Sequence, residues 1–349
     1  MLKISIRYLI KRLFNIAVSG LSIFLGMGSA FATPFILATD GANSLIRQYS
    51  LNGLELGQIR NDNFSFPTLL ASDASGTSFV TDINFIGANG PDLVRFGLDG
   101  SITARNSSAS IFGRQGGGIV SVVDSGHSSF IVTSTLNTEI AEVGYDLQPI
   151  RRFSSNTHSD GLRTLGTTMS PDNTKIYVSD GDSQSGNGFI RIFDYTTGTQ
   201  IDSITHHLLE FPIFLNFTST GTLLVSDRGS SYVDDRLLVF DADGNFLDEF
   251  TSGATIHYNF GSFDILPDDS IVLLETNFLT DTPIRILSPS GDFIREFGAG
   301  LKDSHGIIAV NVSAVPEPST FVLLSMGVLI ILFTRVIGRN SVSAAMVEQ

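Results

Sequence analysis

The sequence contains no cysteine and no tryptophan, and its 21 lysine and arginine residues are outnumbered by 35 aspartate and glutamate residues. Without cysteine no disulfide framework can form, so the stability of the fold must come from its core. The formal net charge of -14 argues against nucleic acid and anionic membrane surfaces as partners. The same charge is compatible with divalent cations and with neutral or basic partners.

The N-terminus has the order of segments found in secretory signal peptides. Basic residues come first, at Lys3, Arg7, Lys11 and Arg12. The apolar stretch Leu13–Gly28 is next, and Ala30 and Ala32 then form an A-x-A cleavage site. We therefore predict a signal peptide over residues 1–32 and a mature chain that starts at Thr33. An uncleaved membrane anchor is the alternative.

The C-terminus combines a rigid break, an apolar run and basic residues. Pro316 and Pro318 cannot continue a helix or a central strand, so they separate the preceding domain from the C-terminal segment. The run Phe321–Phe333 is uncharged but short for a bilayer core, which needs about 20 apolar residues. When Val336 and Ile337 are counted and Arg335 extends its side chain to the interface, the segment can just span. We predict a transmembrane helix followed by a short cytoplasmic tail over residues 340–349. A buried C-terminal core helix is the alternative.

Residues 315–339 resemble the PEP-CTERM sorting signal of Gram-negative bacteria. The resemblance is carried by Val315, Pro316, Glu317, Pro318 and Ser319, by the apolar run behind them, and by Arg335 and Arg339. It implies that an exosortase in the inner membrane recognises the chain, cleaves it near the Pro-Glu-Pro sequence and releases the domain to the cell surface or extracellular matrix. It also implies a link to exopolysaccharide and biofilm, with membrane anchoring by the C-terminal helix before cleavage.

Between these ends one phrase recurs six times, as an apolar strand that ends in a small or hydroxyl residue and usually an acid. The copies are Phe35–Asp40, Ser78–Asp82, Phe130–Ser134, Lys175–Asp180, Leu223–Asp227 and Ile271–Glu275. They lie roughly 42 to 52 residues apart, which is the period of a four-stranded propeller blade. Most copies lead into a second alternating strand and a hairpin turn such as Asp99-Gly100 or Asp243-Gly244. The third repeat lacks this glycine and has Leu147 in its place.

The number of blades is given by how the ring closes. The first copy begins at Phe35 without the strand that normally precedes the phrase, whereas the strand His305–Val310 is left over at the other end. If this spare strand is the innermost strand of the first blade, the sheet edges are protected. We therefore predict an all-β, six-bladed propeller with four-stranded blades over residues 33–314. A β-helix or a sandwich could hold as many strands, but neither explains the period or the spare strand.

The repeats resemble the NHL type, with a fainter similarity to YVTN repeats over Met169–Asp180. The absence of tryptophan speaks against WD repeats. The NHL resemblance implies a propeller of a kind that includes binding scaffolds, hydrolases of the gluconolactonase type and lyases. The fold alone therefore does not give the function.

Propellers bind ligands at the mouth of the central channel, where loops lead into the innermost strands. Ionisable residues in these loops are His158, Asp160, His206, His207, Glu210, His257 and His305. Imidazoles and carboxylates from several blades could hold a divalent metal ion, and we single out His158, Asp160, His207, His257 and His305 as its ligands. The alternative is that they are solvated loop residues, because their offsets from the strands differ from blade to blade.

Two other acidic patterns have structural explanations. The segment Asp180–Gly188 has the composition of a calcium loop, but Arg191 stands where an EF-hand needs a bidentate glutamate. A long polar loop between two strands is therefore the better interpretation. The acids at the strand ends are Asp40, Asp82, Asp180 and Asp227, and we expect them to accept backbone N–H bonds in the next turn.

The sequence shows neither a nucleophile elbow in an α/β context nor a phosphate-binding loop. With the two terminal signals, this favours an exported, membrane-sorted propeller that acts as a binding module of the cell envelope or matrix. Its partners would be an exosortase for sorting and an exopolysaccharide or surface protein for function. A metal-dependent hydrolase or lyase with its site at the propeller mouth is the alternative, and a purely structural surface protein is a third hypothesis.

Overall fold

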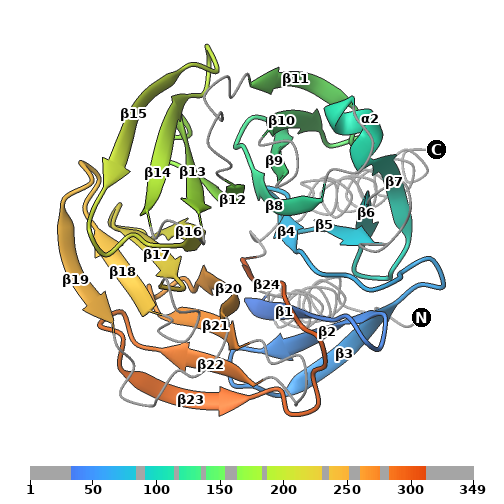
Figure 1. Cartoon of the computed structure of the whole chain (residues 1–349). Coiled ribbons are helices and arrows are strands. Elements are labelled where there is room, and N and C mark those ends of the chain that lie inside the picture. Colours follow the sequence, from blue (N-terminus) through green and yellow to red (C-terminus); the bar gives the residue numbers. More distant parts are fainter. Residues whose placement is uncertain are drawn as a thin grey trace, which may run out of the picture. The chain divides into compact units, whose positions relative to one another are not determined.

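The computed structural model describes residues 33–83, 91–113, 118–134, 139–153, 163–182, 187–229, 236–250, 260–275 and 283–311. Residues Pro34–Asn311 form one compact unit. Within this unit, six four-stranded antiparallel sheets surround a central axis as the blades of a propeller (Figure 1). The predicted all-β, six-bladed propeller with four-stranded blades is therefore confirmed for this part of the chain.

Each blade runs from an innermost to an outermost strand. Blade 1 consists of β24 (Ile307–Val310), β1 (Phe35–Asp40), β2 (Leu45–Ser50) and β3 (Glu55–Arg60). Blade 2 consists of β4 (Ala71–Ser72), β5 (Ser78–Ile83), β6 (Asp92–Gly97) and β7 (Ile102–Ser107), and the short helix α2 (Ser108–Phe112) comes directly after it. Blade 3 consists of β8 (Ile119–Asp124), β9 (Ser129–Ser134), β10 (Glu139–Gly144) and β11 (Pro149–Phe153).

The second half of the ring repeats this order. Blade 4 consists of β12 (Arg163–Met169), β13 (Lys175–Asp182), β14 (Asn187–Asp194) and β15 (Gln200–Thr205). Blade 5 consists of β16 (Pro212–Phe217), β17 (Leu223–Asp227), β18 (Arg236–Phe240) and β19 (Phe246–Phe250). Blade 6 consists of β20 (Phe260–Ile265), β21 (Ile271–Glu275), β22 (Ile284–Leu287) and β23 (Phe293–Phe297).

The repeated apolar phrase forms the second strand of every blade. In β1, β9 and β17 all residues are buried, because these strands face a neighbouring blade on each side. A strand covered on both faces reads as a continuous apolar run instead of an alternating one. The core lies between adjacent blades: Ile36 and Tyr49 of blade 1, for example, belong to the same cluster as Val272 and Ile284 of blade 6.

The predicted ring closure is confirmed. Strand β24 pairs with β1, and Phe35 lies opposite Val310 in the ladder. The closing strand begins two residues later than the predicted His305, because the N–H groups of His305 and Gly306 donate to the Thr39 hydroxyl, at 3.1 and 3.0 Å. This closure joins residues near the two ends of the unit in one sheet.

The turns between third and fourth strands need a left-handed residue. In blade 1 this is Gly53, at φ 84°, where an added Cβ would lie 2.6 Å from Cγ of Phe297 in blade 6. In blade 3 the position is taken by Leu147, at φ 61°. Its side chain is fully buried in the cluster that contains Phe112 and Phe130, so burial offsets the backbone strain that a glycine would avoid.

The polar segment with the composition of a calcium loop is mostly strand. β13 extends to Asp182 and β14 begins at Asn187, and these two residues are ladder partners. The connection between the two strands is therefore shorter than the long loop predicted from the sequence.

Candidate functional site

The innermost strands surround a central cavity of about 230 Å³. Each innermost strand contributes one residue from an equivalent position to the cavity wall. In every blade this residue is the ladder partner of the residue that lies three positions before the end of the repeated phrase. These residues are Ser72, Val123, Thr168, Asn216, Asp264 and Ile308, and all six line the cavity. We call them the central ring. Asp264 is the one ionisable residue among the six.

Asp264 on β20 accepts three hydrogen bonds. Its Oδ1 accepts from Asn216 Nδ2 at 2.5 Å and from Ile265 N at 2.8 Å. Its Oδ2 accepts from Ala309 N at 2.7 Å. Burial raises the pKa of this carboxyl group to about 6, and the three N–H donors oppose the rise. Asp264 thus links blades 5, 6 and 1, and its partners in the described part of the chain are neutral.

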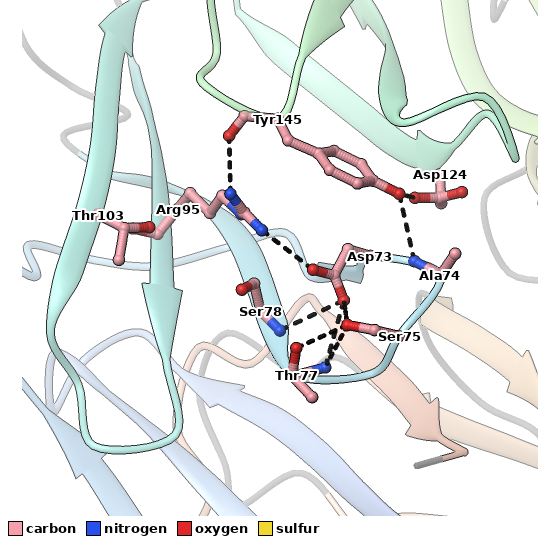
Figure 2. Close-up of polar contacts among 9 residues, drawn as sticks. All are labelled: Asp73, Ala74, Ser75, Thr77, Ser78, Arg95, Thr103, Asp124 and Tyr145. Carbon is pink, nitrogen blue, oxygen red and sulfur yellow. Dashed lines mark hydrogen bonds and ion pairs between the residues drawn. The ribbon is translucent and has the colours of Figure 1, made fainter. Parts of the chain in front are cut away.

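A second carboxylate in the cavity lining, Asp124, is held by the contact between blades 2 and 3. The Tyr145 hydroxyl donates to Asp124 Oδ2 and accepts from Ala74 N at 3.4 Å. Figure 2 shows that the Tyr145 ring lies between Asp124 and Arg95. Arg95 donates to the Tyr145 carbonyl at 3.2 Å and forms an ion pair with Asp73 at 3.0 Å. These bonds position Asp124 and join the two blades.

His305 lines the cavity just before the closing strand β24. Burial lowers the pKa of its imidazole, Arg228 lowers it further, and Asp303 opposes both effects. The imidazole of this lining residue is therefore neutral near pH 7. The described lining of the cavity contains neither lysine nor arginine.

Of the five predicted metal ligands, the structure describes two, His207 and His305, and only His305 lines the cavity. His207 is exposed and does not line the cavity, and the ring of its neighbour His206 stacks on Phe246 of the outermost strand β19, with centroids 4.7 Å apart. His158, Asp160 and His257 lie outside the described residues. Among the residues that the structure describes, no group of three or more His, Cys, Asp or Glu could hold a metal ion. The metal site stays a prediction.

Sequence reasoning missed the central ring because it searched the loops and not the innermost strands. A usable signal was present at Asp264. This residue lies in the stretch Ser262–Ile265, just before the turn that leads into the sixth phrase. Pairing that stretch with the phrase across the turn would have placed Asp264 opposite Val272, at the cavity wall.

The prediction that the strand-end acids accept backbone hydrogen bonds is confirmed at Asp227. Its carboxylate accepts from Gly229 N in the following turn at 2.8 Å. It also accepts from the N–H groups of Glu210 and Phe211, both at 2.9 Å, just before the innermost strand of the same blade. The acid therefore ties two connections of its blade together.

The other three strand-end acids also connect segments of their blades, but through partners other than the N–H groups of the next turn. Asp82 accepts from the N–H groups of Thr68 and Leu69, at 3.1 and 2.8 Å. Two others form ion pairs with an arginine of the next strand, Asp40 with Arg47 at 2.7 Å and Asp180 with Arg191 at 2.8 Å. These acids are structural elements of the blades.

The predicted processing signals lie outside the described residues. This holds for Ala30 and Ala32 at the signal-peptide site, and for the sorting residues Val315, Pro316, Glu317, Pro318, Ser319, Arg335 and Arg339. Within the described ranges, no helix is both long enough and apolar enough to cross a membrane.

Comparison with known proteins identifies the fold. No family profile matches this chain, and no curated protein matches its sequence. Among the solved structures that match, two cover the same share of the chains, 80% of this chain and 99% of the other. One is a protein of unknown function from Bacteroides caccae, with a TM-score of 0.58 and 10% identity. The other is a chain of a nidogen/laminin complex, with a TM-score of 0.62 and 15% identity. At these identities the similarity establishes a shared propeller fold.

Proposed function

We propose that this chain is an exported, membrane-sorted propeller that acts as a binding module of the cell envelope or extracellular matrix. The segment that ends at Ala32 directs export. An exosortase recognises the C-terminal signal, including Pro316 to Pro318, in the inner membrane. The C-terminal helix anchors the chain until cleavage, after which the propeller reaches the cell surface or matrix and binds an exopolysaccharide or a surface protein there.

The pairing of Phe35 with Val310 is the observation that carries this proposal. Because these residues are direct ladder partners, the chain enters and leaves the propeller at neighbouring points of one sheet. Cleavage before Pro34 or after Asn311 removes no strand of the ring. The architecture therefore tolerates processing at both ends, as a sorted and released domain must.

The composition of the cavity agrees with ligand binding. Its described lining offers hydroxyl and amide groups beside apolar side chains, together with Asp124, Asp264 and His305, and a few polar groups in an apolar wall are typical of sites that orient a ligand. The similarity to a chain from a nidogen/laminin complex is an analogy at the level of the fold, and it agrees with an interaction role.

Two experiments test the proposal. The full chain is expressed in a Gram-negative host with and without an exosortase, and cell fractions are analysed. We expect a shortened protein outside the inner membrane only when the exosortase is present. The released protein is then used to capture extracellular polysaccharide and surface proteins. Equal distribution in both hosts would contradict the sorting step, and capture of neither class of partner would contradict the binding role.

The alternative is a metal-dependent hydrolase or lyase, and the position of His305 in the cavity lining favours it. Elemental mass spectrometry of the purified protein separates the two hypotheses. Near-stoichiometric zinc, manganese or iron that is lost in His305→Ala would support the enzyme. Protein without bound metal would leave the binding module as the better hypothesis.

A further inference from the structure

The cavity contains a carboxylate whose described partners are all neutral. Asp264 is bonded to one side-chain amide and two backbone N–H groups. A carboxylate has about four acceptor positions. Two donors occupy Oδ1 and one occupies Oδ2, so one position on Oδ2 is still open. A charge in this environment is costly unless a cation approaches it.

The kind of cation is limited by the surrounding groups. The described lining has no lysine or arginine, and it carries the carboxylates of Asp124 and Asp264, so an anion is disfavoured. A divalent metal ion needs several oxygen ligands, but three N–H donors already point at Asp264. The amide oxygen of Asn216 is also engaged, because it accepts from Phe217 N at 2.8 Å. A primary ammonium needs only acceptors and matches the open position.

The rest of the cavity is rich in hydroxyl groups. Ser72 and Thr168 belong to the central ring, and Thr167 lies beside them in the lining. The Thr167 hydroxyl is shielded from the cavity as well as from solvent. The hydroxyl groups that can meet a ligand there are therefore those of Ser72 and Thr168.

Apolar side chains and the size of the cavity complete the description. Phe214 and Phe263 are among its lining residues, and an apolar wall with a few polar groups is typical of small-molecule sites. The volume of about 230 Å³ is below the roughly 300–1,000 Å³ of sites for drug-sized ligands. One ring with its substituents is therefore the upper limit, and an extended oligosaccharide is too large.

We propose that the central cavity binds a small hydroxylated primary amine of the amino-sugar class, with its ammonium group at Asp264 and its hydroxyl groups toward Ser72 and Thr168. This rests on the proposed binding function and names a ligand class for its central site. Asn216 acts as a positioning residue, because its amide holds the carboxylate at the cavity wall.

Isothermal titration calorimetry on the full chain in detergent tests the assignment at pH 7, with glucosamine as the probe. Glucose lacks the ammonium group, and N-acetylglucosamine carries a neutral amide in its place. We expect glucosamine to bind at least about tenfold more tightly than either, because the charge-assisted bond is the stronger one. Equal binding of the three sugars, or no binding of glucosamine at millimolar concentration, overturns the proposal.

Variants locate the bound amine. Asp264→Asn removes the charge with little change in shape, and we expect at least about a tenfold loss of glucosamine affinity. The matched control is Asp243→Asn, which removes one charge from an exposed turn and should leave the affinity unchanged. Unchanged affinity in Asp264→Asn overturns the proposal.

A measurement on the unmodified protein covers the case in which Asp264→Asn does not fold. Since the pKa of Asp264 is raised to about 6, glucosamine affinity should fall as the pH drops below that value. Affinity that does not change between pH 7 and pH 5 overturns the assignment. Capture of envelope polysaccharide without glucosamine binding refutes this inference alone. Glucosamine binding without capture of any envelope partner refutes the envelope-binding role alone.

Discussion

Asp264 in blade 6 and Asn216 in blade 5 are joined side chain to side chain by a hydrogen bond of 2.5 Å at the wall of the central cavity. The Asn216 oxygen accepts from Phe217 N, which orients the NH₂ group toward the carboxylate. The partner of this carboxylate is therefore a neutral amide, whereas a salt bridge would place a cationic side chain there. The cost of burying the charge is only partly offset, and the pKa of Asp264 rises to about 6.

This raised pKa makes the stability of the propeller depend on pH in a defined direction. The pKa of an aspartate in an unfolded chain is about 3.9, so between about pH 4 and pH 6 the folded state binds the proton more tightly. The contribution of Asp264 is fully present below about pH 4 and is lost as the pH rises through about 6. It amounts to about 2–3 kcal/mol at most.

Urea unfolding of wild type and Asp264→Asn between pH 7 and pH 5 measures the pH-dependent contribution of Asp264 to the free energy of unfolding. Groups common to both proteins cancel in the difference between their free energies of unfolding. We expect wild type to gain stability relative to the variant as the pH falls. A difference that stays constant over this range would show that Asp264 does not titrate there.

Replacing Asp82 by alanine should destabilise the propeller by about 2–4 kcal/mol. The N–H groups of Thr68 and Leu69 and the Thr68 hydroxyl all donate to this buried carboxylate, and each would lose its partner. Chemical denaturation measures the change. Asp243→Ala, at an exposed turn, is the control and should change stability by less than about 0.5 kcal/mol. Similar values for both variants would contradict the role assigned to Asp82.

Alanine substitutions at three glycines distinguish the cost of backbone strain from the cost of a steric clash. Gly53→Ala combines a φ of 84° with a Cβ 2.6 Å from Phe297, so we expect a loss of about 2–4 kcal/mol. Gly221 has a φ of 85° but open space around it, so its alanine variant should lose only about 1 kcal/mol. Gly57→Ala meets neither obstacle and should be neutral or slightly stabilising. Thermal unfolding ranks the three, and a different order would refute the argument.

Shortening the chain at two positions tests the ring closure. A chain that ends at Asn311 keeps β24. A chain that ends at Ser304 lacks β24, so the inner edge of β1 is unpaired and the apolar cluster between blades 1 and 6 is exposed. We expect the first to unfold cooperatively at the temperature of the full-length propeller, and the second to melt more than about 10 °C lower. Circular dichroism during heating measures both. Equal melting temperatures would show that closure by β24 contributes little.

The fold was largely predictable because its determinants are local and repeated. Each phrase ends a strand that is buried on both faces, so the sequence carries its period directly, and the left-over strand at Val310 indicated the closure. The turn at Leu147 was not predictable in the same way. Its left-handed backbone depends on burial among Phe112 and Phe130, which come from other segments of blades 2 and 3.

The site was less predictable. The loop histidines drew attention because imidazoles are chemically distinctive, but their distance along a loop does not fix where the rings point. His207 is exposed while His305 lines the cavity, although both precede an innermost strand. Asp264 attracted no attention in the sequence, since one acid in an apolar strand resembles the structural acids at other strand ends.

The sequence by itself determined the number of blades, the position of most hairpin turns and the strand that closes the ring, because these depend on spacing and on alternation along the chain. Only the tertiary structure decided which side chains meet. Six residues distant in sequence form the central ring because six innermost strands converge on one axis. Burial at that axis, and a neutral amide where a cation could have been, then gave Asp264 its raised pKa.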